Sequence, residues 1–257
     1  MVPAVTEMLF AIGAGPHVVA VSSFDEFPPE VRSLPKVGAL LDPDVERILA
    51  LRPTLVVSYG SQTDLQRQLG RSQVPVFSYR HGGIPAIVET LARLGPAVGR
   101  AAEAERLVAD IRRDLDRVRA AVRGRPRPRT LLIFERDPGA LRGIYVSGGR
   151  GFLHEMLEIA GGVNVFADVD REAVQPSTET LLARAPEVII EVRATGLLTA
   201  AEASGAERSV WAPLASIPAV RGGRIHFLNG DHLVVPGPRV ARATEAFARA
   251  LHPDAFR

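Results

Sequence analysis

The sequence predicts an α/β protein of two lobes, each with a mainly parallel sheet flanked by helices, joined by one long helix. The joining helix is predicted by apolar residues that recur three and four positions apart between Ala101 and Arg123. One segment on each side of this helix, 45–59 and 178–192, has the same pattern. A Glu, an Ala and a Pro stand at matching positions in both segments, and an aliphatic run follows each proline. This order of helix, proline stop and buried strand in both halves predicts two similar lobes.

The long helix is punctuated at both ends. Pro96 stands before it, Gly124 and Pro126 follow it, and it contains no internal Gly or Pro. At about 1.5 Å per residue it would extend roughly 35 Å. We therefore expect a stiff connector that restricts lobe closure to small motions, with a ligand cleft between the lobes. The expected boundaries are 1–96 for the first lobe, 97–124 for the connecting helix and 125–257 for the second lobe.

The other elements follow from periodicity and from Gly and Pro positions. In the first lobe Thr6 is expected to cap a helix that ends near Gly13, and Asp44 to cap the next helix. Later helices are expected at 64–71 and 84–94, and strands or extended pieces at 17–22, 34–38, 55–59 and 75–79. In the second lobe strands are expected at 129–135, 143–147, 188–192 and 225–228, and helices at 152–160, 177–185, 210–214 and 240–251.

Composition excludes several functional classes. The 257 residues are 46% hydrophobic and 23% charged, and the net charge of +2 comes from 31 basic and 29 acidic residues that are spread evenly. This distribution argues against nucleic-acid binding. The chain has no cysteine, so disulfides and thiolate metal sites are excluded. No apolar run approaches the roughly 18 residues of a membrane span.

Enzyme motifs are missing as well. The sequence contains no Gly-x-Ser-x-Gly elbow, no phosphate-binding Gly-Lys-Ser/Thr loop and no His-Glu-x-x-His pair. The glycine turn Gly148 to Gly151 precedes an expected helix and could bind an anion, but a tight turn explains it equally well. These observations favour a binding protein over an enzyme.

Several segments match one family in order along nearly the whole chain. They are VPAVTEMLFAIGAG, SSFDEFPPE, VERILALRPTLVVSY, SGGRGFLHEMLEIAGGVNVF, PSTETLLARAPEVII and DHLVVPGPRVARATEAFARAL. In these segments the chain resembles the substrate-binding proteins of ABC importers that take up metal chelates, and most closely those that bind cobalamin. The resemblance implies the class III periplasmic binding fold, built on a helical backbone like the metal receptors. Members usually begin with a strand that ends where Met1 stands here. Either the start is cut short or misassigned, which we expect, or this lobe lacks that element.

The resemblance also implies a biological setting. It predicts a protein without enzymatic activity or resident cofactor, whose transported ligand is cobalamin or a related metal chelate. The expected partner is a membrane-embedded permease with its ATPase, and no nucleic acid is expected. We expect a monomer in the periplasm or another extracytoplasmic location, either free or lipid-anchored.

The ligand-binding residues are carried over from the same resemblance. Phe27, Tyr59 and Tyr145 would face the flat corrin ring, although the two tyrosines could instead cap sheet edges. Asp231 matches an acidic residue near the ligand. His81 and His232 could reach a cobalt or haem iron, or could be ordinary surface residues. The expected ligand-binding set is Pro3, Ala4, Phe27, Tyr59, His81, Tyr145, Asp231 and His232.

Two departures from the family leave the ligand open. Val235 and Ala173 stand where a basic residue and a tryptophan are usual. A haem or ferric-siderophore receptor therefore remains an alternative, and an enzyme acting in the same cleft is a third. For docking on the permease the resemblance indicates Glu179 in the second lobe and Asp64 in the first. The competing interpretation of both residues is stabilisation of a helix start.

Overall fold

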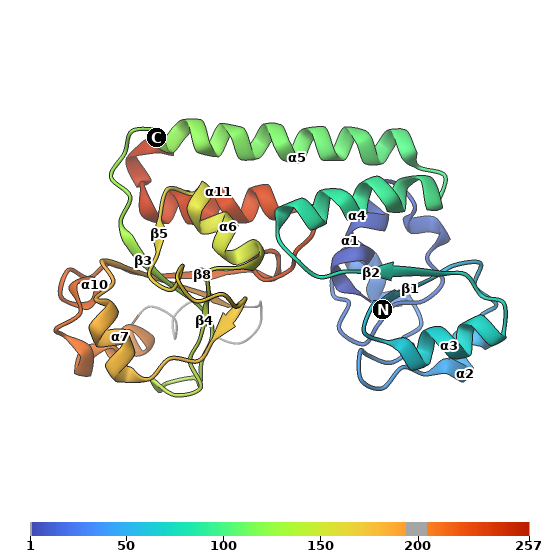
Figure 1. Ribbon diagram of the computed structural model, residues 1–257, viewed down its shortest axis with the longest axis horizontal. Coiled ribbons are helices and arrows are strands. Elements are labelled where there is room, and N and C mark those ends of the chain that lie inside the picture. The colour runs from blue at the N-terminus through green and yellow to red at the C-terminus, as the bar shows by residue number, and fades with distance from the viewer. Residues whose placement is uncertain (1, 194–204, 257) are drawn as a thin grey trace. The chain divides into compact units, whose positions relative to one another are not determined.

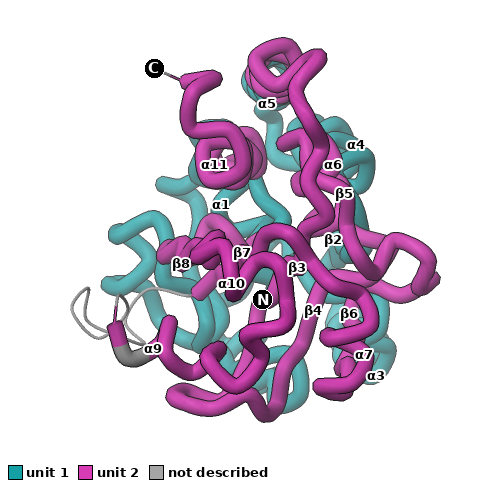
Figure 2. The backbone as a smooth tube through the Cα atoms, turned by 90° about the vertical axis from the view of Figure 1, so that its left-hand side faces the viewer, with its two compact units in different colours: residues 1–111, 236–238 teal, residues 112–235, 239–257 magenta. Residues whose placement is uncertain are grey.

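The computed structural model describes residues 2–193 and 205–256 of the chain. The chain divides into two compact units (Figure 2). Unit 1 contains residues 1–111 and 236–238, and unit 2 contains residues 112–235 and 239–257. The division falls inside α5 (Ala101–Val122), which is one uninterrupted helix of 22 residues, as its periodicity predicts.

Unit 1 combines helices with a small parallel sheet (Figure 1). Strands β1 and β2 pair in parallel from Val56↔Val76 to Tyr59↔Tyr79. Buried Ile48, Leu65 and Leu69 form part of the core around them. The elements of this unit are α1 (Pro3–Ala11), η1 (Gly15–His17), η2 (Pro29–Ser33), α2 (Val45–Ala50), β1 (Val56–Tyr59), α3 (Thr63–Arg71), β2 (Val76–Tyr79) and α4 (Ile84–Ala97).

The predicted helix starts in unit 1 are partly confirmed. The side chain of Asp44 accepts a hydrogen bond from the backbone N–H of Arg47 at 2.9 Å, so the predicted cap of α2 is confirmed. The prediction that Thr6 caps α1 is wrong, because α1 begins at Pro3 and Thr6 is buried within the helix. Proline suits the first helical position because its φ is already helical and its missing N–H is not needed there.

The strand predicted at 17–22 is wrong. Residues Gly15–His17 form η1, and Val21 makes only an isolated parallel bridge with Lys36. This turn begins at Gly15 and ends at His17, which removes the first residue of the predicted strand. Val19 is 49% exposed, so this apolar run does not occupy the buried strand position that its composition suggested.

Unit 2 is built on a mixed sheet in the order β6-β4-β3-β7-β8, with β5 paired to β3. Among the described residues, β3 pairs in parallel with β5 and β7, and β7 with β8, while β4 pairs antiparallel with β3 and β6. The antiparallel part arises because β4 follows β3 after only a short loop, which leaves no room for a crossover helix. The strands are β3 (Arg129–Glu135), β4 (Tyr145–Ser147), β5 (Val163–Asn164), β6 (Ala173–Val174), β7 (Val188–Arg193) and β8 (Ile225–Asn229).

Helices cover both faces of this sheet. In Figures 1 and 2, α6 and α11 lie together on one side and α7 and α10 on the other. The core beneath α7 and α10 includes fully buried Leu131, Ile189 and Trp211. The helices are α6 (Gly151–Ile159), α7 (Thr178–Arg184), α9 (Ala206–Ser209), α10 (Pro218–Arg221) and α11 (Val240–Leu251), with the short turns η3 (Ala212–Leu214), η4 (Asp231–Leu233) and η5 (Pro253–Phe256).

Four charged residues are buried together where β3 and β7 end. We call Arg136, Glu191, Arg193 and Glu207 the buried charge cluster. Glu191 Oε2 lies 2.9 Å from both Arg136 Nε and Arg193 Nη2. Glu207 Oε2 accepts hydrogen bonds from Arg136 and, at 2.8 Å, from Arg193. Trp211 Nε1 donates to the other Glu191 oxygen at 2.7 Å, so the cluster ties β3, β7 and the segment around α9 together.

The residues of this cluster stabilise one another's charged forms. Burial opposes ionisation of Glu207, but the hydrogen bonds and charges of Arg193 and Arg136 outweigh it and hold the pKa of Glu207 below its usual value. Burial likewise opposes the charge on Arg193, and its hydrogen bonds with Glu207 and Glu191 nevertheless raise its pKa. Two arginines and two glutamates therefore form a neutral, hydrogen-bonded unit in the interior.

Three histidines of unit 2 should make the protein less stable below neutral pH. Burial is the first cause that lowers the pKa of His226, His232 and His252 below 6.5, and nearby arginines lower all three further. Since the unfolded chain binds protons more readily, this contribution to stability is present above pH 6.5 and is lost as the pH falls through the folded pKa values. We expect the melting temperature to fall between pH 7 and pH 5.5, and H226Q, which cannot titrate, to reduce that fall. A melting temperature that is constant over this range would contradict the prediction.

Candidate functional site

Unit 1 exposes apolar side chains on two neighbouring loops. We call Phe24, Phe27, Leu40 and Leu41 the apolar loop cluster; they are 72%, 39%, 41% and 93% exposed. The two loops are joined by a hydrogen bond from Ser23 N to Gly38 O at 2.9 Å. Large exposed apolar side chains that gather in one place indicate an interaction surface.

Tyr59 is tied to this cluster through Gln62. Gln62 Nε2 donates to Leu40 O at 2.9 Å, and Gln62 Oε1 accepts from Tyr59 N at 3.0 Å. Tyr59 ends β1, and its ring meets that of its strand neighbour Tyr79 edge to face, with centroids 5.4 Å apart. Burial, and then the charge of Asp25, raise the pKa of Tyr59. The phenol is therefore protonated at neutral pH and can donate a hydrogen bond.

Asp25 lies buried inside the loop that carries Phe24 and Phe27, with 1% of its surface exposed. Its Oδ2 accepts hydrogen bonds from Ser22 N at 2.8 Å and from Ser22 Oγ. Lys36 Nζ donates to the backbone oxygen of Asp25 at 2.8 Å, away from the carboxylate. Asp25 Oδ1 has no hydrogen-bond partner among the described residues. Such an unsatisfied buried acceptor costs about 1–3 kcal/mol, and no motif in the sequence around Asp25 reveals it.

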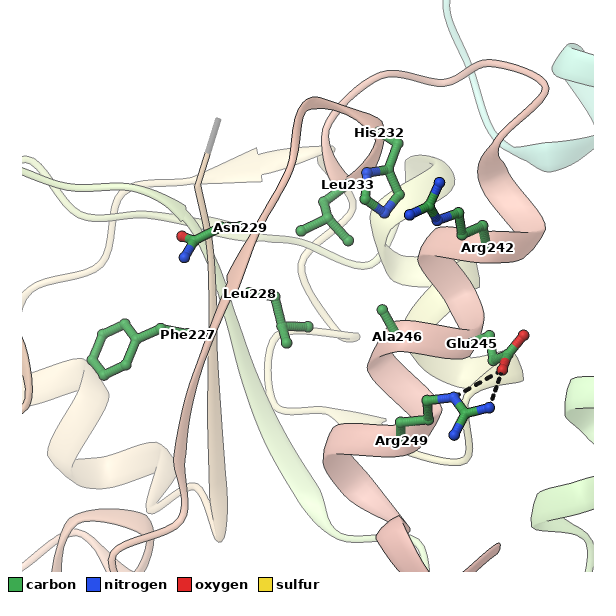
Figure 3. A pocket seen from close by; sticks show the side chains of 9 residues that line it. All are labelled: Phe227, Leu228, Asn229, His232, Leu233, Arg242, Glu245, Ala246 and Arg249. Atoms are coloured by element: carbon green, nitrogen blue, oxygen red, sulfur yellow. Dashed lines mark hydrogen bonds and ion pairs between the residues drawn. The ribbon is translucent and has the colours of Figure 1, made fainter. Parts of the chain in front are cut away.

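Unit 2 contains a pocket of about 450 Å³ between β8, η4 and α11 (Figure 3). His232 and Arg242 line it, and Arg249 at its other end pairs with Glu245, Nη2 to Oε1, at 2.6 Å. Burial, and then the charges of Arg239 and Arg242, lower the pKa of His232. Its imidazole is therefore neutral at pH 7 and can hydrogen-bond or bind a metal ion through a ring nitrogen.

The structure brings together only some of the predicted residues of unit 2. Asp231 and His232 share η4, directly after β8. Tyr145 begins β4, which β3 and β7 separate from β8 in the sheet. Its ring lies 6.3 Å from that of Phe134, with an angle of 37° between the planes. Tyr145 is half-buried, so part of its surface is available for contact.

The remaining predicted residues of unit 1 lie apart from Tyr59 in the sequence. Pro3 is half-buried and Ala4 buried at the start of α1, and His81 is exposed just after β2. A second cavity, of about 770 Å³, lies within unit 1 and is lined mainly by apolar groups such as Val18, Val56 and Pro75. None of the predicted ligand-binding residues lines it.

The two predicted docking residues differ in their surroundings. Glu179 is exposed in the first turn of α7, and a hydrogen bond with Ser177, followed by one with its own backbone, lowers its pKa. Asp64 is exposed in the first turn of α3 and pairs with Arg67 at 2.8 Å. The local pairing of Asp64 agrees with its interpretation as a helix-start residue, whereas Glu179 keeps its carboxylate at the surface.

The N–H groups of the glycine turn before α6 are hydrogen-bonded within the protein. They donate to backbone oxygens, from Gly148 to Glu172 at 3.0 Å, from Gly149 to Val169 at 2.8 Å and from Arg150 to the oxygen of Arg171 at 3.2 Å. No N–H of these three residues is left for an anion. This pairing favours the tight-turn interpretation of the motif.

Two features are absent from residues 2–193 and 205–256. No three His, Cys, Asp or Glu side chains come together as a metal-ion site. No helix in these ranges combines the length and the apolar character of a membrane span.

A fold of two α/β units that share one long helix, with aromatic side chains at strand ends, defines a class of ligand-binding proteins. The chain belongs to the periplasmic binding protein family, whose model matches residues 2–231. It is 30% identical to the vitamin B12-binding protein of Salmonella typhimurium over 251 residues, which cover 97% of this chain and 87% of that protein. It is 26% identical to the ABC transporter substrate-binding lipoprotein YvrC of Bacillus subtilis, over 100% of this chain and 80% of the relative.

Solved structures show the same fold. The periplasmic haem-binding protein RhuT of Roseiflexus sp. RS-1, in its apo form, matches with a TM-score of 0.82 at 27% identity, over 99% of this chain and 97% of that chain. The periplasmic vitamin B12-binding protein BtuF of Vibrio cholerae matches with a TM-score of 0.81 at 24% identity, over 100% and 96%. The predicted family and fold class are thus confirmed.

Proposed function

We propose that this protein is the substrate-binding component of an ABC importer, which captures a cobalamin-like corrinoid outside the cytoplasm and delivers it to a membrane permease with its ATPase. The observation that carries the proposal is the 30% identity to a vitamin B12-binding protein over 97% of the chain. The relative that is named an ABC transporter substrate-binding lipoprotein supports the same role. We propose a monomer, free or lipid-anchored.

The chemistry of the candidate residues suits this ligand. A corrinoid is a broad, largely apolar disc with polar amide arms, so its receptor needs aromatic or apolar walls and a few hydrogen bonds. The apolar loop cluster and Tyr59 supply such groups in unit 1, and Tyr145 supplies an aromatic face in unit 2. These contacts require no catalytic group, and the ligand leaves chemically unchanged.

A haem or ferric-siderophore receptor is the second candidate. It is favoured by the 27% identity to a haem-binding protein and by the neutral imidazole of His232. An enzymatic function would be supported instead by turnover that is lost in D231A or H232A.

Titration with cyanocobalamin and with haemin tests the proposal. We expect the wild type to bind cyanocobalamin, and Y59A and Y145A each to weaken that binding about tenfold or more, because buried aromatic contacts dominate binding energy. L182A removes a side chain that is 38% exposed on α7 and serves as a control with unchanged affinity. Haemin binding with a Soret band that Y59A or H81A weakens, without cobalamin binding, would favour the second candidate.

Docking on the permease can be tested separately from ligand binding. The resemblance implies that Glu179 meets an arginine of the permease. We therefore expect E179R to reduce corrinoid uptake in membrane vesicles at least tenfold while ligand affinity stays unchanged, because like charges at a docking surface are strongly unfavourable. D64N should have a smaller effect, since Asp64 already pairs with Arg67. Uptake by E179R at the wild-type rate would contradict the assignment.

A further inference from the structure

Asp25 has three features that are not found together in an ordinary structural carboxylate. It is 1% exposed, its Oδ1 has no partner among the described residues, and it lies in the loop that bears exposed Phe24 and Phe27. A buried charge is normally paired or fully hydrogen-bonded, because desolvation is otherwise costly. Ser22 satisfies Oδ2 of this carboxylate, and Oδ1 is buried without a hydrogen-bond partner among the described residues.

We propose that Asp25 selects the ligand: its Oδ1 accepts a hydrogen bond from an N–H group of the bound molecule, and so favours corrinoids, whose rim carries amides, over haems, whose propionates are anions. This inference rests on the proposed function and names the residue that sets the ligand specificity of the protein. Binding sites built around a hydrogen bond reject ligands that leave the buried group unpaired.

The local charge supports the same selection. Residues 22–46 contain six acidic and two basic side chains, so an anionic group that approaches this region is repelled. Of the two basic residues, Lys36 donates to the backbone oxygen of Asp25, and Arg32 lies 3.8 Å from Glu26. Neither cation is hydrogen-bonded to Asp25 Oδ1. An amide N–H can satisfy this oxygen without bringing in a negative charge.

A ligand can reach this oxygen through movement of side chains. Phe24, next to Asp25 in the chain, is 72% exposed, and exposed side chains change rotamer within nanoseconds. The backbone of the loop is held by the hydrogen bonds of Ser23 to Gly38 and of Lys36 to Asp25. The carboxylate is therefore held in place, and access to its buried Oδ1 requires the side chains that cover it to move.

The substitution D25N replaces the hydrogen-bond acceptor Oδ1 by a hydrogen-bond donor. Ser22 N and Ser22 Oγ both donate to Oδ2, so they hold the amide oxygen of an asparagine there and leave its NH₂ group where Oδ1 was. We expect D25N to weaken cyanocobalamin binding about tenfold or more and to tighten haemin binding. D25A, which removes the acceptor without adding a donor, should also weaken cyanocobalamin binding.

D42N is the matched control, because it makes the same charge change on an exposed carboxylate in the neighbouring loop and should change both affinities less than threefold. Melting temperatures of all variants confirm folding, and a correctly folded D25A keeps the test decisive if D25N is unstable. Two results would overturn the selection by Asp25 and leave the proposed function intact. One is that D25N and D25A have unchanged affinities, and the other is that D25N changes the affinities for both ligands in the same direction. A wild-type protein that binds haemin but not cyanocobalamin would overturn both.

Discussion

Replacing Glu191 by Gln is expected to lower the free energy of unfolding by about 3–5 kcal/mol. The substitution removes the charge that Arg136 and Arg193 share within the buried charge cluster, and leaves two arginines with Glu207 alone. The side chains of Arg136 and Glu191 are each 2% exposed, so water cannot compensate for the lost partner. Urea unfolding followed by circular dichroism measures the effect.

The matched control for this prediction is an ion pair at the surface. D116N removes a comparable contact with Arg119 on α5, where both side chains are at least half exposed. Exposed pairs contribute about 0–1 kcal/mol, so D116N should unfold almost like the wild type. Equal effects of E191Q and D116N would show that the buried charge cluster does not hold β3, β7 and α9 together.

Replacing Gly149 by Ala should also be strongly destabilising, by about 1–3 kcal/mol or more. A Cβ at this position would lie 2.2 Å from the backbone oxygen of Ala167, and one at Gly148 would lie 2.2 Å from that of Arg171. Because both obstacles are backbone atoms, the segment 167–171 must move. Since β4 ends at Ser147, immediately before this turn, we also expect weaker corrinoid binding through displacement of Tyr145.

G70A is the control for the glycine prediction. A Cβ there meets no atom within 4 Å, and Gly70 lies inside α3. Alanine is the better helix former, so G70A should be neutral or up to about 1 kcal/mol more stable than the wild type. If G149A proves as stable as G70A, the turn tolerates a side chain and its close packing has been misjudged.

The sequence predicts best those elements that local rules determine. The periodicity of α5 and the cap at Asp44 depend on residues close together in the chain, and both agree with the structure. The strand predicted at 17–22 is wrong because an apolar run does not reveal whether a partner strand is available. The family resemblance indicated Tyr59 and Tyr145, and their roles as ligand contacts stay predictions.

The features that the sequence did not reveal depend on tertiary structure. Arg136 and Glu207 are 71 positions apart, and no spacing rule pairs them. Asp25 is visible in the sequence as one acid in a polar loop, but its burial and unpartnered oxygen follow only from how Ser22 and Lys36 are arranged around it. Pairing and burial of charges are properties of the fold and not of local patterns.

The most direct test of corrinoid binding is isothermal titration of the purified protein with cyanocobalamin, followed by mass spectrometry of the recovered ligand. The proposed function predicts saturable binding and a ligand that is recovered with its mass unchanged. Absence of binding under conditions in which haemin binds, or a ligand recovered as a different compound, would contradict it.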